Sequence, residues 1–264
     1  MDKIKIIIRK EWAEVFKNKM VIFTVAFLPL IMTALPLISL FSTRDVGSNN
    51  SLNTEMSQSI TKSMCSINLN GSECFQVYLV SQFMMMFMLI PLAIPITIAA
   101  YSIVGEKNNR SLEPLLATPI TTMELLVGKS LAAVIPAVIA TFGSFLLFIL
   151  GAWLIITSKD VILAFLDLRW IIAIFIVGPL LAILAVNLSL MISSRVNDPR
   201  AAEQISMVLI VPVLGLFFGQ MAGLFVINIE IISITAFILV LFDLLIVFMA
   251  IKVFDREAIL TRWK

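Results

Sequence analysis

Few residues in this chain could carry out chemistry, and their types exclude most catalytic mechanisms. The 264 residues contain no histidine, which removes the commonest general base and metal ligand. Asp243 is the one charged residue within a predicted membrane span, where burial must be offset by neutralisation, a partner or water. Asp243 is therefore either a functional residue or the partner of a Ser, Thr or Asn on another helix. An intramembrane protease is not expected, because no second aspartate accompanies Asp243.

Val127-Gly128-Lys129-Ser130 imitates the last residues of a nucleotide-binding P-loop. The spacing does not fit, since the first glycine of that motif would fall on Met123. The context does not fit either, because a helix is expected before the motif and a strand is needed there. We expect no nucleotide, no metal and no catalytic site in this chain.

The segment Gly105–Lys129 is the least apolar part of the chain's interior, yet its pattern is not that of a plain loop. Leu112, Leu115 and Leu116 are three and four residues apart, which places them on one face of a short helix. Pro119 ends that helix. Thr121 to Glu124 has the Thr-x-x-Glu spacing of a capping box, which predicts the start of a new helix. A helix, a break and a capped restart favour a docking element.

Three motifs in this segment resemble those of a known family. They are Gly-Glu-Lys at 105–107, Ser-Leu-Glu-x-Leu-Leu-x-Thr-Pro-Ile at 111–120 and Glu-Leu-x-x-Gly-Lys at 124–129. The chain thereby resembles the ABC type-2 permeases, the membrane subunits of a class of ABC exporters, and residues 254–262 are similar to the family's usual ending.

The resemblance implies that the helix Ser111–Ala117 docks into a groove on a separate ATPase subunit. The residues expected to make this contact are Glu106, Arg110, Leu112, Glu113, Leu115, Leu116 and Pro119. Of these, Glu106, Arg110 and Glu113 are expected at the rim of the contact. ATP and Mg²⁺ would bind in the partner, and this chain would hold no cofactor.

Composition predicts an all-α membrane protein. Apolar residues make up 60% of the chain, above the roughly 45–50% of soluble domains. Six apolar stretches are long enough for the about 20 helical residues that cross a bilayer. They are Met20–Phe41, Gln76–Val104, Ser130–Ser158, Trp170–Ser194, Ile205–Ile229 and Ile231–Ile251. We expect one transmembrane permease domain over residues 1–264.

The distribution of positive charge predicts the orientation. With the N-terminus in the cytoplasm, 15 of the 19 Lys and Arg residues lie on the cytoplasmic side, as the positive-inside rule requires. We therefore expect a multi-pass protein of the plasma or inner membrane with both termini in the cytoplasm. Residues 42–75 then form an external loop and residues 105–129 a cytoplasmic coupling segment.

Residues 1–20 predict an amphipathic elbow helix in the membrane interface. Ile4, Ile8, Trp12, Val15 and Phe16 lie on one face, and basic residues fill the other. Both cysteines, Cys65 and Cys74, belong to the external loop, where a disulfide is favoured over a reduced pair.

Two further sets of residues are candidates for the pathway and the dimer contact. The Met-rich run with Met84, Met85 and Phe87 either lines a path for a lipophilic substrate or packs against lipid and helices. Gly215, Gly219 and Gly223 are spaced by four and form a small-residue stripe where the family has its dimer contact, and Phe218 is expected to take part in the same contact or in the pathway. The resemblance also implies a re-entrant helical hairpin between spans five and six, near 223–233. Asn187 in span four is expected to face other helices.

The sequence therefore predicts the permease subunit of an ATP-driven exporter. The expected partners are two ATPase subunits, a second copy of the chain in a homodimer, and the lipid bilayer, without nucleic acid. An ion-gradient-driven secondary transporter or channel is the alternative that Asp243 leaves open. The sequence does not identify the substrate, but it favours a lipophilic or peptide-like one.

Overall fold

The computed structural model describes residues 2–43, 71–108, 120–156, 158–225 and 227–253. Every regular element in these ranges is a helix. In chain order they are α1 (Asp2–Val15), α2 (Lys19–Thr43), α4 (Gly71–Met86), η3 (Phe87–Leu89), α5 (Ile90–Asn108), α7 (Thr122–Ile155), α8 (Lys159–Phe165), α9 (Leu168–Ile172), η4 (Ala173–Val177), α10 (Gly178–Arg195), α11 (Pro199–Ser206), η5 (Met207–Leu209), α12 (Ile210–Met221) and α13 (Ile229–Val253).

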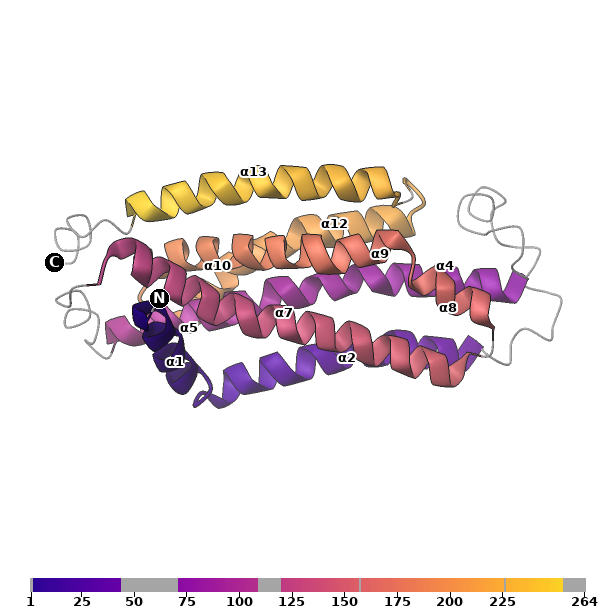
Figure 1. The fold of residues 1–264 in the computed structure, drawn as a ribbon, viewed down its shortest axis with the longest axis horizontal. Coiled ribbons are helices and arrows are strands. Elements are labelled where there is room, and N and C mark those ends of the chain that lie inside the picture. Colours follow the sequence, from indigo (N-terminus) through magenta and orange to yellow (C-terminus); the bar gives the residue numbers. More distant parts are fainter. Residues whose placement is uncertain (1, 44–70, 109–119, 157, 226, 254–264) are drawn as a thin grey trace.

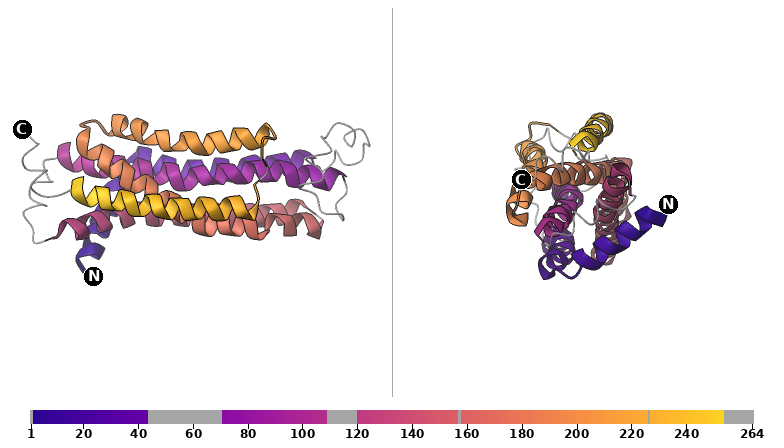
Figure 2. Two further views of the ribbon diagram at one scale, coloured as in Figure 1. Left: turned by 90° about the horizontal axis from the view of Figure 1, so that it is seen from above. Right: turned by 90° about the vertical axis from the view of Figure 1, so that its left-hand side faces the viewer.

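Six helical stretches are long and apolar enough to cross a membrane, which confirms the predicted all-α membrane protein. They are Val21–Thr43, Glu73–Glu106, Met123–Ile155, Lys159–Arg195, Pro199–Met221 and Ile229–Ile251. Each overlaps the corresponding stretch of the sequence prediction. They run side by side along the long axis of the molecule, while α1 lies across one end (Figures 1 and 2). We call this the α1 end and the opposite one the α8 end.

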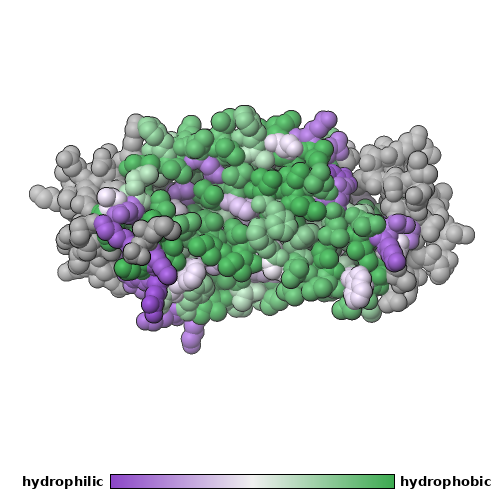
Figure 3. All heavy atoms as spheres, in the orientation of Figure 1, coloured by the Kyte–Doolittle hydropathy of each residue, from purple (hydrophilic) through white to green (hydrophobic). Residues whose placement is uncertain are grey.

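The surface of the bundle is apolar between its two ends. Figure 3 shows hydrophobic residues over the middle and hydrophilic ones gathered near the α1 and α8 ends. A belt of this kind is what the hydrocarbon core of a bilayer requires.

The central helix of the bundle is α5. It packs against α2, α7, α10 and α11, and its side chains from Ile90 to Ala100 are buried. A helix that is apolar on all sides is either enclosed by protein or surrounded by lipid, and α5 is enclosed by its neighbours. At the start of α5, the rings of Phe87 and Phe148 lie 5.8 Å apart and those of Phe148 and Phe165 5.7 Å. These aromatic contacts bring α7 and α8 onto span two.

Three spans lose regular α-helical geometry, and each does so four residues before a proline. The 3₁₀ turn η3 contains Phe87, four before Pro91; the π turn η4 contains Phe175, four before Pro179; the 3₁₀ turn η5 contains Val208, four before Pro212. A proline has no N–H to donate to the carbonyl four residues earlier, and its ring crowds that carbonyl. A proline accompanies each of these breaks, although Pro29, Pro36, Pro95 and Pro136 lie inside α2, α5 and α7 without one.

Spans five and six are joined by a turn, so the expected re-entrant helical hairpin is not found among the described residues. The helix α12 ends at Met221 and α13 begins at Ile229. Gly223 has a φ of +72°, and its N–H donates to the carbonyl of Gln220. This left-handed glycine ends α12. Span six, moreover, begins right after Asn228 with Glu230 in its first turn, which leaves no residues for a hairpin.

The N-terminal helix is held against α7 at a glycine. A Cβ atom added at Gly128 would lie 2.8 Å from Cγ2 and 3.0 Å from Cβ of Ile7. These atoms are close to the backbone of α1, so they cannot move away without moving the helix. Gly128 therefore sets how closely α1 approaches α7.

We predict that Gly128→Ala and Gly143→Ala have opposite effects on stability. Both glycines lie inside α7, where alanine is favoured by about 1 kcal/mol. A Cβ at Gly143 meets nothing within 4 Å, so that variant gains stability. Gly128→Ala displaces Ile7, so that variant loses stability. Thermal unfolding in detergent, together with tryptic cleavage within α1, measures both effects. Equal stabilisation by the two substitutions would contradict this packing.

Candidate functional site

Five polar side chains from three helices meet in the interior of the α1 end. They are Lys10 and Glu11 of α1, Ser102 and Glu106 of α5, and Lys129 of α7. We call them the charge cluster. Glu11, Ser102, Glu106 and Lys129 are buried, and Lys10 is half-buried. The two clustered residues of α5 lie in its last turns and Lys129 in the second turn of α7, so the cluster lies on both sides of residues 109–121.

Lys129 is the hub of the charge cluster. Its Nζ lies 2.7 Å from Glu11 Oε1, 2.8 Å from Ser102 Oγ and 2.8 Å from Glu106 Oε2. An ammonium group has three protons, and each has an oxygen within reach. The second oxygen of Glu11 accepts from Ser102 Oγ at 2.6 Å. The second oxygen of Glu106 is paired with Lys10 Nζ at 2.5 Å.

The charge cluster is electrically balanced, with two ammonium groups and two carboxylates. Burial by itself raises the pKa of Glu11, but the adjacent Lys129 ammonium and the hydrogen bonds from Lys129 and Ser102 lower that pKa below its usual value. Glu11 is therefore ionised at neutral pH. A buried ion pair of this kind costs much desolvation and is tolerated only when its hydrogen bonds are satisfied.

The structure places Glu106 inside the protein, and its expected place at the rim of an ATPase contact is wrong. Its side chain is 2% exposed because two lysines neutralise it there. The other expected contact residues, Arg110, Leu112, Glu113, Leu115, Leu116 and Pro119, lie outside the described residues. The capping box is confirmed: Thr121 Oγ1 accepts from the N–H of Glu124, and Glu124 Oε2 accepts from the N–H of Thr121.

Glu11 was missed in the sequence, although a signal was present. The buried stripe of α1 consists of Ile7, Glu11 and Val15, which are four residues apart. An acidic side chain in the middle of an apolar helical stripe needs a buried partner. Trp12, predicted on the apolar face of the elbow helix, lies beside this stripe, and its Nε1 donates to the carbonyl of Ala132 at 2.8 Å.

The residues that imitate a P-loop tail each have a packing role. Gly128 admits Ile7, and Lys129 is the hub of the charge cluster. Ser130 Oγ donates to Asn187 Oδ1 at 3.2 Å, and Asn187 Nδ2 donates to the carbonyl of Ile183. Asn187 thus faces α7, as expected for a polar residue of span four. These three residues join α7 to α1, α5 and α10.

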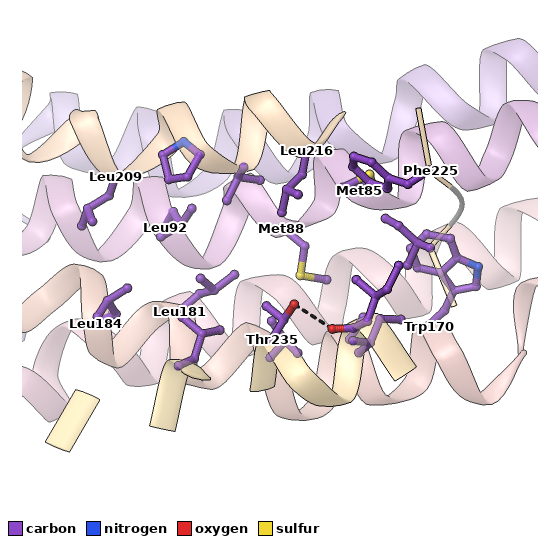
Figure 4. A pocket seen from close by; sticks show the side chains of 18 residues that line it. Met85, Met88, Leu92, Trp170, Leu181, Leu184, Leu209, Leu216, Phe225 and Thr235 are labelled. Carbon is purple, nitrogen blue, oxygen red and sulfur yellow. Dashed lines mark hydrogen bonds between the residues drawn. The ribbon is translucent and has the colours of Figure 1, made fainter. Parts of the chain in front are cut away.

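A second candidate site is an apolar cavity of about 230 Å³ among spans two, four, five and six. Met85, Met88 and Leu92 form one wall, as Figure 4 shows. The other walls are formed by Trp170, Ala173, Val177, Leu181, Leu184, Leu209, Pro212, Val213, Leu216, Phe225, Ile227, Ile231, Ile232, Thr235 and Leu239. Of the proposed pathway residues in the Met-rich run, only Met85 lines this cavity.

Met84 and Phe87 instead lie in the core of the bundle. Neither has any exposed surface, because α4 and α5 are enclosed by the other spans. Span two is therefore unable to present these side chains to a second copy of the chain. Met84 and Phe87 thus have a packing role, whereas Met85 lines the apolar cavity.

The predicted glycine stripe is not one surface. A Cβ at Gly219 would lie 2.8 Å from the ring of Phe225 in the same chain, and Gly223 ends the helix. The exposed residues of η5 and α12 instead include Val208, Val211, Gly215 and Phe218, which are three and four residues apart. Gly215 and Phe218 stay as candidates for a contact with a second copy.

Asp243 lies on the buried face of α13, which packs against α10. Neither of its carboxyl oxygens has a hydrogen-bond partner among the described residues. The expected Ser, Thr or Asn partner is thus not found there. The predicted disulfide involves Cys65, which lies outside the described residues; Cys74 is buried near the start of α4. No group of three or more potential metal ligands occurs in the described ranges.

Comparison with known proteins gives one match. The model of a family described as ABC-2 family transporter protein matches residues 5–253. No curated protein matches the chain. The matched range includes every residue of the charge cluster and of the cavity.

We predict that Lys129→Met destabilises the protein by about 3–5 kcal/mol, because it leaves a buried carboxylate unpaired. Lys5→Met is the matched control, since it removes the same charge from an exposed position of α1. It should change the free energy of unfolding only slightly. Chemical unfolding in detergent measures both. The double variant Lys129→Met/Glu106→Gln restores the charge balance. Its loss in free energy of unfolding should be smaller than the sum of the losses in Lys129→Met and Glu106→Gln. Strict additivity would argue against a coupled cluster.

Proposed function

Because the chain belongs to the ABC-2 transporter family, and is thus a membrane permease, we propose that it is the membrane-spanning subunit of an ATP-driven exporter. Two copies form the translocation unit, and each binds an ATPase subunit that holds ATP and Mg²⁺. ATP hydrolysis belongs to that partner. The α1 end and both termini face the cytoplasm of the plasma or inner membrane.

The observation that carries this proposal is the charge cluster. A transport subunit must convert a push on its cytoplasmic side into a movement of its spans. Residues 109–121 connect α5 to α7, and Lys129 pairs with carboxylates of α5 and α1 next to this connection. The two helices that flank the coupling segment 105–129 are thereby held to each other and to α1. A force on the segment moves all three together.

The position of the N-terminal helix supports the same proposal. It lies across the α1 end of the bundle (Figure 2), and Lys3 pairs with Glu124 at 3.6 Å near the capping box. As an elbow helix, α1 lies in the membrane interface beside the coupling segment. Its exposed basic side chains then face the anionic lipid headgroups.

A secondary transporter or channel driven by an ion gradient is the second candidate, and Asp243 favours it. A buried carboxyl group without a partner in a membrane span is a candidate proton or cation site. Transport by the purified chain together with its ATPase distinguishes the two candidates. Export that requires ATP supports the permease, and transport that follows an ion gradient without nucleotide supports the second candidate.

We predict that Leu116→Asp abolishes binding of the ATPase subunit while the bundle stays folded. In the proposed coupling helix, burial of this leucine contributes about 1.5–3 kcal/mol, and an aspartate replaces that gain with a desolvation cost. Pull-down of the ATPase and ATP hydrolysis are measured on folded, purified protein. Glu113→Ala should give a milder defect that depends on salt.

The matched control is Leu166→Asp, an exposed leucine between α8 and α9 at the other end of the bundle. It should leave ATPase binding unchanged. Full ATPase binding and activity in Leu116→Asp would refute the coupling helix. A lower unfolding temperature in Leu116→Asp, but not in Leu166→Asp, would mean that the segment packs against the bundle or the bilayer.

We predict that Gly215→Leu weakens the dimer. No atom of the described residues lies within 4 Å of a Cβ at this position, so an effect reports on a neighbouring copy. Gly143→Leu is the matched control, because its Cβ also meets nothing but lies on α7. Native mass spectrometry or crosslinking in detergent measures the dimer fraction. Equal dimer fractions in both variants would exclude the exposed face of α12 as the interface.

A further inference from the structure

The three helix breaks meet at one place in the fold. Met88 of η3, Ala173 and Val177 of η4, and Leu209 of η5 all line the apolar cavity. The breaks come from three different spans, and each lies four residues before a proline. Each of the three spans thus contributes a deformed turn to the cavity walls.

Helix breaks at membrane depth need protection from lipid, because backbone groups released from the α-helical pattern are costly in hydrocarbon. A regular helix would avoid this cost. The breaks also make each span easier to bend at this level. Their convergence indicates that the cavity is a place where the walls can change shape around an occupant.

The chemistry of the walls specifies a hydrocarbon occupant. The lining residues are apolar except for Thr235, and the Thr235 hydroxyl donates to the carbonyl of Ile231 at 2.8 Å (Figure 4). No other lining residue has a hydroxyl, amide or charged side chain. Water or a polar headgroup would find few hydrogen-bond partners here, and an apolar cavity of this kind stays dry.

The cavity is partly open, and its walls include two spans with exposed apolar outer faces. The helix α12 packs against α4, whereas α13 packs against α10, and the cavity is lined by residues of both. The outer faces of the two helices carry large exposed apolar residues such as Val211, Phe237 and Leu241.

We propose that this cavity binds an acyl chain of a membrane lipid, which enters sideways between α12 and α13. The headgroup stays at the level of the bilayer surface, and the polarizable sulfur atoms of Met85 and Met88 adapt to chains of different shape. The statement that such a lipid is the exported cargo rests on the proposed function. The binding of its acyl chain in the cavity does not rest on it.

The test uses the purified full-length chain in phosphatidylcholine vesicles that contain a phosphatidylcholine with a photoreactive diazirine on one acyl chain. The expected result is preferential labelling of residues that line the cavity. Val213→Trp fills the cavity and lowers this labelling. The matched control Val240→Trp makes the same change on the exposed face of α13 and leaves the labelling unchanged.

A second variant tests the chemistry of the occupant. Leu216→Gln puts an amide into the wall and should lower cavity labelling about tenfold, since hydrocarbon cannot satisfy it. Labelling spread evenly over all exposed apolar positions, with no effect of Val213→Trp, overturns the proposal. The assay contains no ATPase, and Leu116→Asp should label as the unmodified chain does. Failure of the cavity proposal and failure of the coupling proposal are thus separate results.

Discussion

The arrangement of the α1 end depends on one ammonium group that is surrounded by three oxygen atoms. Lys129 satisfies Glu11, Ser102 and Glu106 at the same time, and Lys10 completes the charge balance. Without Lys129, two carboxylates would share one half-exposed lysine, a costly arrangement in the interior of a protein. The cluster therefore fixes the register of α1, α5 and α7 more strictly than apolar packing alone, which tolerates small shifts.

What the sequence predicted well were features set by neighbouring residues. The six spans follow from apolar length and the start of α7 from the Thr121–Glu124 capping box. Each of these needs only the chain within one helix, so no knowledge of the fold is required.

What the sequence could not predict depends on contacts between distant residues. The spacing of Gly215, Gly219 and Gly223 suggests one surface, but Phe225 covers Gly219 and Gly223 ends the helix. Glu106 resembles a surface charge until Lys10 and Lys129 are brought to it from 96 and 23 positions away. The split of the Met-rich run between core and cavity depends in the same way on how α4 is enclosed.

The charge cluster and the cavity lie on one helix, and this connects the two sites. The helix α5 is continuous from Ile90 to Asn108, with Leu92 in the cavity wall and Ser102 and Glu106 in the cluster. Leu92 and Glu106 are separated by about 21 Å at the helical rise of about 1.5 Å per residue. The break at η3 lies directly before this rod. In the proposed exporter, a tilt imposed on the cluster therefore turns α5 about η3 and moves the wall of the cavity.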